Sequence, residues 1–213
     1  FSSGSYVVFN APGFANLGRM VYLNGGTPNA PNGIALGIGS SMVGSGNVNA
    51  KIAAGFGSTI RATGSLNLGD SNSYAGFFSD GELYTEENRV ELKDRNQAVL
   101  GSLTQLGTDT EDGILVADNG LVVEFGKNVV GRGIIDTPND PLTPLMNNGD
   151  IIGDSPNAIE LTGYVKGVGT LTNVTVSGTL SPGFSPVRMH ATNLGIAADG
   201  DLIMELGGLS GGS

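Results

Sequence analysis

The sequence predicts an all-β chain wound into a parallel β-solenoid. Short apolar and β-branched stretches recur about every 8–14 residues, and each is closed by Gly, Asn, Asp or Pro. The chain holds 36 Gly and 19 Asn, which supply many corners with positive φ. No window keeps an apolar stripe at helical spacing over three turns without a Gly or Pro, so we expect no long helix.

The predicted strands follow one another along the whole chain. Those near the N-terminus are runs of Val, Tyr, Ile and Ala, the central ones are rich in Leu and Val, and those near the C-terminus alternate Thr with apolar residues. They cover residues 5–9, 19–23, 47–54, 58–62, 65–68, 88–94, 98–106, 113–117, 121–125, 150–153, 158–167, 170–176 and 201–206.

Residues 81–95 carry the densest run of charge, with 8 charged side chains between Glu82 and Arg95. Opposite charges alternate along this segment, which suits cross-strand pairing and protection of a sheet edge. We therefore expect a solvated edge hairpin whose outward-facing side chains are Glu86, Glu87, Arg89, Glu91, Lys93 and Arg95.

Gly-bounded units of similar shape favour a solenoid over other all-β folds. They lie at residues 57–64, 64–70, 113–120, 169–178 and 178–186, and their loose spacing indicates an imperfect repeat. The alternative is a β-sandwich or jelly roll, for which we would expect longer alternating strands and more aromatic residues than the 8 Phe and 5 Tyr present. With about 20 residues per coil, the chain would make on the order of ten coils and a rod of roughly 50 Å.

Length and composition predict one soluble domain. We expect residues 1–213 to form a single β-solenoid domain, and the start at Phe1 without a Met suggests a processed piece or a fragment of a longer exported protein. The net charge of −10 argues against nucleic acid as a partner. No apolar stretch reaches the roughly 18–20 residues of a membrane span, and no Cys is present for disulfides, thiolate chemistry or zinc.

The sequence singles out no catalytic, cofactor-binding or metal-binding residue, so we expect a protein that is not an enzyme. It lacks a nucleophile elbow, a dinucleotide-binding glycine pattern and a P-loop. The one histidine, His190, is more typical of a surface residue than of a base. Asp109, Glu111 and Asp112 are close enough in sequence to leave calcium open as a ligand, although acidic residues at such a turn more often cap nearby amides.

A turn with two Ser-Pro pairs follows the predicted strand 170–176. Pro182 and Pro186 fix φ and remove backbone donors, so the chain should leave the hydrogen-bonded ladder there. Gly183 should form the corner, and Phe184 should pack over the exposed layer of the coil.

This turn, "GTLSPGFSP" (178–186), and the later segment "ADGDLIMELGG" (198–208) resemble one group of exported bacterial proteins. These are β-strand-repeat proteins with autotransporter-type passenger repeats, which often carry a PEP-CTERM sorting tail. Residues 162–186 and 66–85 are similar to the same repeats. The resemblance implies a right-handed solenoid at the cell surface or secreted beyond it, with no catalytic residues to transfer. Where such proteins continue with further strands and the tail, this chain ends at "GGLSGGS" (207–213).

The expected function is therefore that of an extracellular structural or adhesive module of the bacterial cell surface or matrix. Self-association through the solenoid ends would give head-to-tail fibres, and the strand at 5–9 could instead pair with the edge of a neighbour. The alternative is a β-helix that binds or degrades extracellular polysaccharide. An enzyme of that kind needs a cleft with two or more carboxylates and a nearby aromatic ring or Arg.

Overall fold

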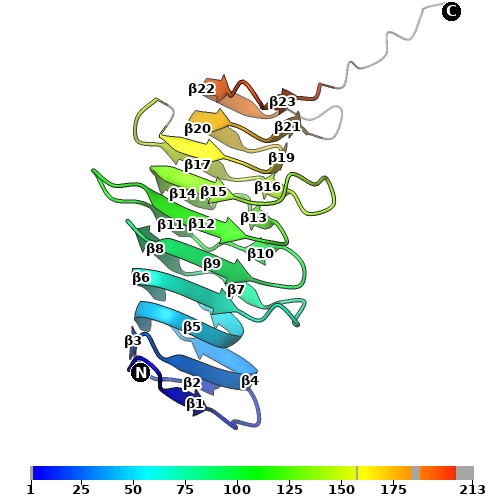
Figure 1. The fold of residues 1–213 in the computed structure, drawn as a ribbon. Coiled ribbons are helices and arrows are strands. Elements are labelled where there is room, and N and C mark those ends of the chain that lie inside the picture. Colours follow the sequence, from blue (N-terminus) through cyan, green and yellow to red (C-terminus); the bar gives the residue numbers. More distant parts are fainter. Residues whose placement is uncertain (1, 157, 184–187, 205–213) are drawn as a thin grey trace, which may run out of the picture.

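The computed structural model describes residues 2–156, 158–183 and 188–204. Across these residues the chain forms strands, turns and bends, and no helix. The strands wind into about nine turns that stack from the N-terminal coil to the C-terminal coil (Figure 1). The predicted all-β solenoid is confirmed, and the chain is neither a sandwich nor a jelly roll. In this part of the chain there is no helix that could cross a membrane.

Each complete coil contributes to three faces, which we name A, B and C in chain order. Face A contains β3 (Met20–Asn24), the beginnings of β5 (Ser41–Ala54) and β6 (Thr59–Gly69), β8 (Glu82–Glu86), β11 (Leu103–Leu106), β14 (Asn128–Gly131), β17 (Asp150–Gly153) and the beginnings of β20 (Thr170–Val176) and β22 (His190–Ile196). Face B contains β1 (Tyr6–Val8), the beginning of β4 (Thr27–Leu36), the middle of β5, the ends of β6, β20 and β22, and the strands β9 (Arg89–Lys93), β12 (Gly113–Ala117), β15 (Gly133–Asp136) and β18 (Ile159–Leu161). Face C contains β2 (Ala15–Asn16), the ends of β4 and β5, β7 (Phe77–Ser79), β10 (Ala98–Val99), β13 (Leu121–Val123), β16 (Leu145–Asn147), β19 (Tyr164–Gly167), β21 (Thr179–Pro182) and β23 (Asp201–Leu202).

All pairings between these strands are parallel and join one coil to the next. The sequence distance between paired residues varies with the coil, from 15 residues between Ile159 and Val174 to 26 between Gly133 and Ile159. Among the described residues the register shifts only between Ala30 and Ile34, between Gly44 and Gly46 and between Gln105 and Leu106, so the differences in length are taken up at or near the corners.

The core is a set of apolar ladders that run along the inside of the stack. On face C, Leu121, Leu145, Val165 and Leu180 lie opposite one another in successive coils, and all four are fully buried or nearly so. Burial alternates along most strands of the inner coils, so that every second side chain joins such a ladder. Burying one side chain of this size contributes about 1.5–3 kcal/mol.

One turn recurs at the corner between face C and face A of the next coil. In each case a backbone N–H bonds to the carbonyl three residues earlier, and a glycine with positive φ takes the third position of the turn. The residue before the glycine projects into solvent. The three turns are residues 37–40, 55–58 and 124–127, with the exposed tips Ile38, Phe56 and Phe125.

The predicted edge hairpin at residues 81–95 is wrong. Its two halves, β8 and β9, lie on different faces of one coil, and each pairs with the coils before and after it. The outward orientation of the charged side chains is nevertheless as expected, because Leu83, Val90 and Leu92 take the buried positions. Alternation defines which side of a strand faces water, whereas it does not define the partner strand.

Leu145→Ala tests the ladder. This change leaves a cavity between Leu121 and Val165, and we expect it to cost about 2–5 kcal/mol of unfolding free energy. Met146→Ala is the matched control, because Met146 is the next residue of the same strand and points outward. The measurement is the urea midpoint followed by circular dichroism, and equal shifts for the two variants would contradict the assignment of inward and outward sides.

Candidate functional site

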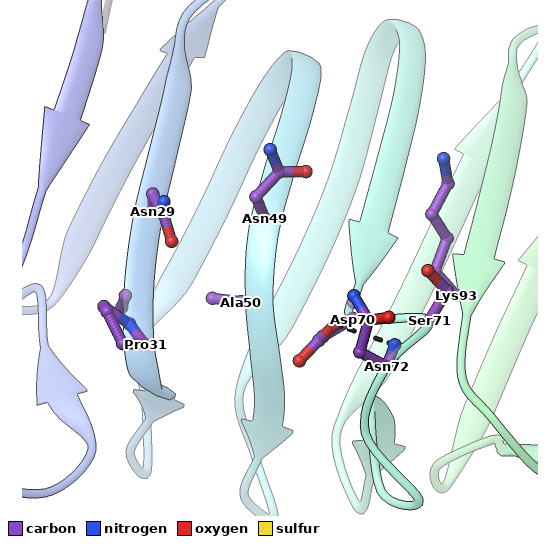
Figure 2. Close-up of a pocket in the computed structure, with 10 residues that line it drawn as sticks. Asn29, Pro31, Asn49, Ala50, Asp70, Ser71, Asn72 and Lys93 are labelled. Carbon is purple, nitrogen blue, oxygen red and sulfur yellow. Dashed lines mark hydrogen bonds between the residues drawn. The ribbon is translucent and has the colours of Figure 1, made fainter.

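A polar groove of about 350 Å³ lies on face B beside the loop 70–76 (Figure 2). The amides of Asn29 and Asn49 line one side, and Asp70 and Asn72 of the loop line the other, with Lys93 beyond them on β9. These side chains come from four successive coils, so the stacking of the solenoid brings them together.

Gly69 creates the opening of this polar groove. In the outward ladder Asn29 lies opposite Asn49, Asn49 opposite Gly69, and Gly69 opposite Lys93, so one step of the ladder has no side chain. The φ of Gly69 is +110°, and a Cβ at this position would lie 2.1 Å from the carbonyl oxygen of Lys93. Only glycine fits this backbone without strain.

The charged groups of the polar groove already have partners. An Oδ1 atom of Asp70 accepts a hydrogen bond of 2.9 Å from the N–H of Asn72, and the Lys93 ammonium lies 3.4 Å from Glu91. Asp70 is also the one carboxylate among the groove-lining side chains. The arrangement can hydrogen-bond a polar ligand, and it lacks the second carboxylate that glycoside hydrolysis requires.

A second depression of about 480 Å³ lies on the other side of the loop 70–76, and we name it the corner cleft. Val99 and Val122, which lie opposite one another on face C, are among the residues that line it. Tyr74 and Arg95 line it from the side of this loop, and Leu142 lines it from the loop 137–144.

The base of the loop 70–76 is held by a buried carboxylate. Asp94 is 3% exposed, and its two oxygens accept hydrogen bonds from the N–H groups of Phe77 and Asn96. The N–H of Arg95 donates to the carbonyl of Ser73 at 2.9 Å. These bonds tie the loop to the next coil and so position Tyr74 over Arg95, whose guanidinium carbon lies 4.5 Å from the centre of the ring.

Two carboxylates meet in a third, smaller depression. Asp118 and Asp136 line a pocket of about 220 Å³ with Val116, Thr137 and Pro138. Asp136 already accepts a hydrogen bond of 2.7 Å from the hydroxyl of Thr162. In none of the three depressions do two carboxylates lie together with an aromatic ring or an arginine, which is the combination expected of a polysaccharide-degrading enzyme.

The candidate calcium residues do not gather into a site. The turn at 108–112 is closed by Thr108, whose hydroxyl accepts the N–H of Glu111 at 3.0 Å, and Asp112 pairs with Arg132 at 3.0 Å. Asp109 contributes its carbonyl to the same arginine. In the described ranges no three acidic or histidine side chains are placed to hold a metal ion.

The remaining predicted features fall near the C-terminal end of the stack. His190 is exposed at the start of β22, opposite Thr170. Pro182 ends β21 and Gly183 has a φ of +74°, as the predicted corner requires. Phe184 and Pro186 lie outside the described residues, so the packing predicted for Phe184 stays a prediction.

The charged segment forms a cluster on face A. The guanidinium of Arg61 pairs with Glu86 and lies over the ring of Tyr84, 4.2 Å from its centre. The hydroxyl of Tyr84 donates to Glu82 at 2.9 Å. This hydrogen bond is the main cause that raises the pKa of Tyr84, and partial burial and the negative charge of Glu82 add to it, whereas Arg61 opposes it.

Comparison with known proteins returned no matching family model, no matching curated protein and no matching solved structure. The candidate sites therefore rest on the geometry described above.

Gly69→Ala tests the strained corner of the polar groove. We expect a loss of about 1–3 kcal/mol of stability, because the new Cβ meets the Lys93 carbonyl and φ is unfavourable. Ser71→Ala changes an exposed position of the same loop and should leave the free energy of unfolding, measured by urea denaturation, within about 0.5 kcal/mol of wild type. If both variants unfold at the wild-type midpoint, the positive φ at position 69 is incorrect.

Glu82→Gln tests the origin of the Tyr84 pKa. We expect the pKa to fall toward 10.0, since the carboxylate that holds the phenol neutral is gone. Because the folded pKa is the higher one, the stabilisation by Tyr84 is complete below pH 10 and is lost as pH rises through the folded pKa. The measurement is absorbance titration at 295 nm of wild type and of Glu82→Gln. Subtracting the curve of the matching Tyr84→Phe variant from each isolates the titration of Tyr84. If the two difference curves have the same midpoint, the assignment of the pKa shift to Glu82 is wrong.

Proposed function

We propose that this chain is a non-enzymatic structural or adhesive module of a bacterial cell surface or extracellular matrix. Copies would associate end to end into fibres. The observation that carries the proposal is that strands at both ends of the described stack form a ladder on one side only, apart from isolated bridges of Ser2 to Asn24 and Gly25, which leaves edges on which a further coil could stack.

The last described coil supports this proposal most directly. Ile196 and Leu202 lie in register with the buried residues Val176 and Leu180, and so continue the core ladders. They are nevertheless 37% and 50% exposed. A coil stacked on them would bury apolar surface and complete the backbone pairing.

The first coil offers a matching surface. The strands β1 and β2 pair with β4 alone, and β3 pairs with β5. Beside them Phe9, Leu17 and Met20 line an open depression of about 510 Å³. All strands run in the same direction, so the last coil of one copy would contact the first coil of the next copy. Such a head-to-tail contact repeats from copy to copy without closing into a ring, which gives a fibre.

End-to-end contact is favoured over donation of the strand at 5–9. Tyr6, Val7 and Val8 of β1 already pair in register with β4 of the same chain. Donating this strand to a neighbour would first break those bonds. The placement at a bacterial surface rests on the resemblance of residues 178–208 to exported repeat proteins.

Ile196→Lys/Leu202→Lys tests the assembly. Both positions are exposed in the single chain, so we expect little loss of stability, but an interface would bury the lysines without partners. Light scattering and electron microscopy should show linear particles for wild type and single chains for the double variant. Thr192→Lys is the control, since Thr192 is also exposed on β22 and pairs with the outward Thr172. A monodisperse wild-type monomer over a wide concentration range would overturn the fibre proposal.

A further inference from the structure

The corner cleft combines a ring surface with unused hydrogen-bonding groups. Tyr74 is 64% exposed, although Arg95 stacks on its ring. No carboxylate of the described residues forms an ion pair with Arg95. The guanidinium therefore holds a fixed position while its N–H groups have no charged partner.

The polar groups of the cleft are also held in place. The side-chain amide of Asn119 donates to the carbonyl of Asp94, and that of Gln97 donates to the carbonyl of Pro144, both at 2.7 Å. Each amide keeps its oxygen as an acceptor. Because the Gln97 bond reaches Pro144, which follows the loop segment with Leu142 and Thr143, the opposite wall of the cleft is held as well.

The size of the cleft suits an extended ligand. The two loops belong to coils that are three steps apart in the stack, with the corners of the two intervening coils between them. Three steps at about 4.8 Å place the loops roughly 14 Å apart. This length exceeds that of a single sugar ring.

These features match the chemistry of a pyranose. The C–H groups on one face of such a ring carry partial positive charge and stack on the negative face of an aromatic ring. Its hydroxyl groups both donate and accept, so they need the mixed donors and acceptors that Arg95, Asn96 and Asn119 provide. We propose that the corner cleft binds a polysaccharide strand, with one pyranose ring stacked on the face of Tyr74 that Arg95 leaves open and the polar groups of an adjacent ring hydrogen-bonded by Arg95 and the neighbouring amides.

This inference rests on the adhesive part of the proposed function and names its ligand class. A protein ligand is less well matched, because the apolar floor of Val99 and Val122 is small and is framed by amides on the solvent side. The binding partner of Arg95 depends on the charge of the sugar. In a neutral hexopyranose the N–H groups of Arg95 would donate to hydroxyl groups, and in a uronate they would donate to a carboxylate.

The test is calorimetric binding of a neutral hexaose of β-linked glucose and of a hexameric galacturonate to the full chain. We expect at least one to bind, and Tyr74→Ala to weaken its Kd by tenfold or more. Tyr74→Phe should stay within about threefold of wild type, since the ring remains. Phe56→Ala is the matched control, because it removes an exposed aromatic side chain from a distant corner and should leave Kd unchanged.

Arg95→Ala separates the two kinds of sugar. A loss for the galacturonate that exceeds the loss for the glucose hexaose assigns Arg95 to a carboxylate, and equal losses assign it to hydroxyl groups. Absence of binding to both sugars, or equal effects of Tyr74→Ala and Phe56→Ala, would overturn the proposal. Light scattering of the same samples reports fibre formation separately, so failure of sugar binding and failure of assembly are distinguishable.

Discussion

Register between neighbouring coils is the constraint on which the rest of this structure depends. The N–H and C=O groups of each inner strand point alternately to the coil before and the coil after, so a strand cannot shift against one neighbour without losing the other. A slip by one residue would also turn Leu121, Leu145 and Val165 from the core to the solvent. Variation in coil length is therefore confined to the corners, where the loops 70–76 and 137–144 project.

The same constraint explains why the candidate sites lie where they do. The polar groove and the corner cleft are assembled from residues that are far apart in sequence and one to three coils apart in space, as Asn29, Asn49 and Lys93 are in the polar groove. A flat face of the solenoid offers rows of side chains and little concavity. The projecting loops supply the walls, and a missing side chain, as at Gly69, supplies the opening.

The fold could be predicted from the sequence because its determinants are local. Regular spacing of short apolar strands, with Gly and Asn at the corners, leaves few all-β folds open, and each strand predicted from the sequence overlaps an observed one. Several observed strands lie outside the predicted stretches, among them β4, β14, β15, β16 and β22. The strand at 27–36 was missed because Pro28 and Pro31 argue against a strand interior. Pro28 is tolerated because the pairing of β4 with β5 begins only at the next residue, Asn29. No hydrogen bond to β5 therefore requires the N–H group that Pro28 lacks.

The candidate sites were much less predictable than the fold. The hairpin at 81–95 failed because charge alternation describes a strand surface and carries no information on whether the chain turns back or turns a corner. Tyr74 and Arg95 are 21 residues apart, about one coil, but the coil lengths vary too much for the sequence to align them. The one available signal was the wide gap between predicted strands around residues 70–76, which marks a projecting loop.

The recurring corner turn has a consequence for how such a rod changes in length. Residues 37–41 read GIGSS and residues 55–59 read GFGST, and both make the same turn at the same place in successive coils. Recombination between the two gene segments would remove or duplicate one whole coil and leave every other strand in phase. The number of coils could thus drift in evolution, while the loops that carry the surface chemistry remain as they are.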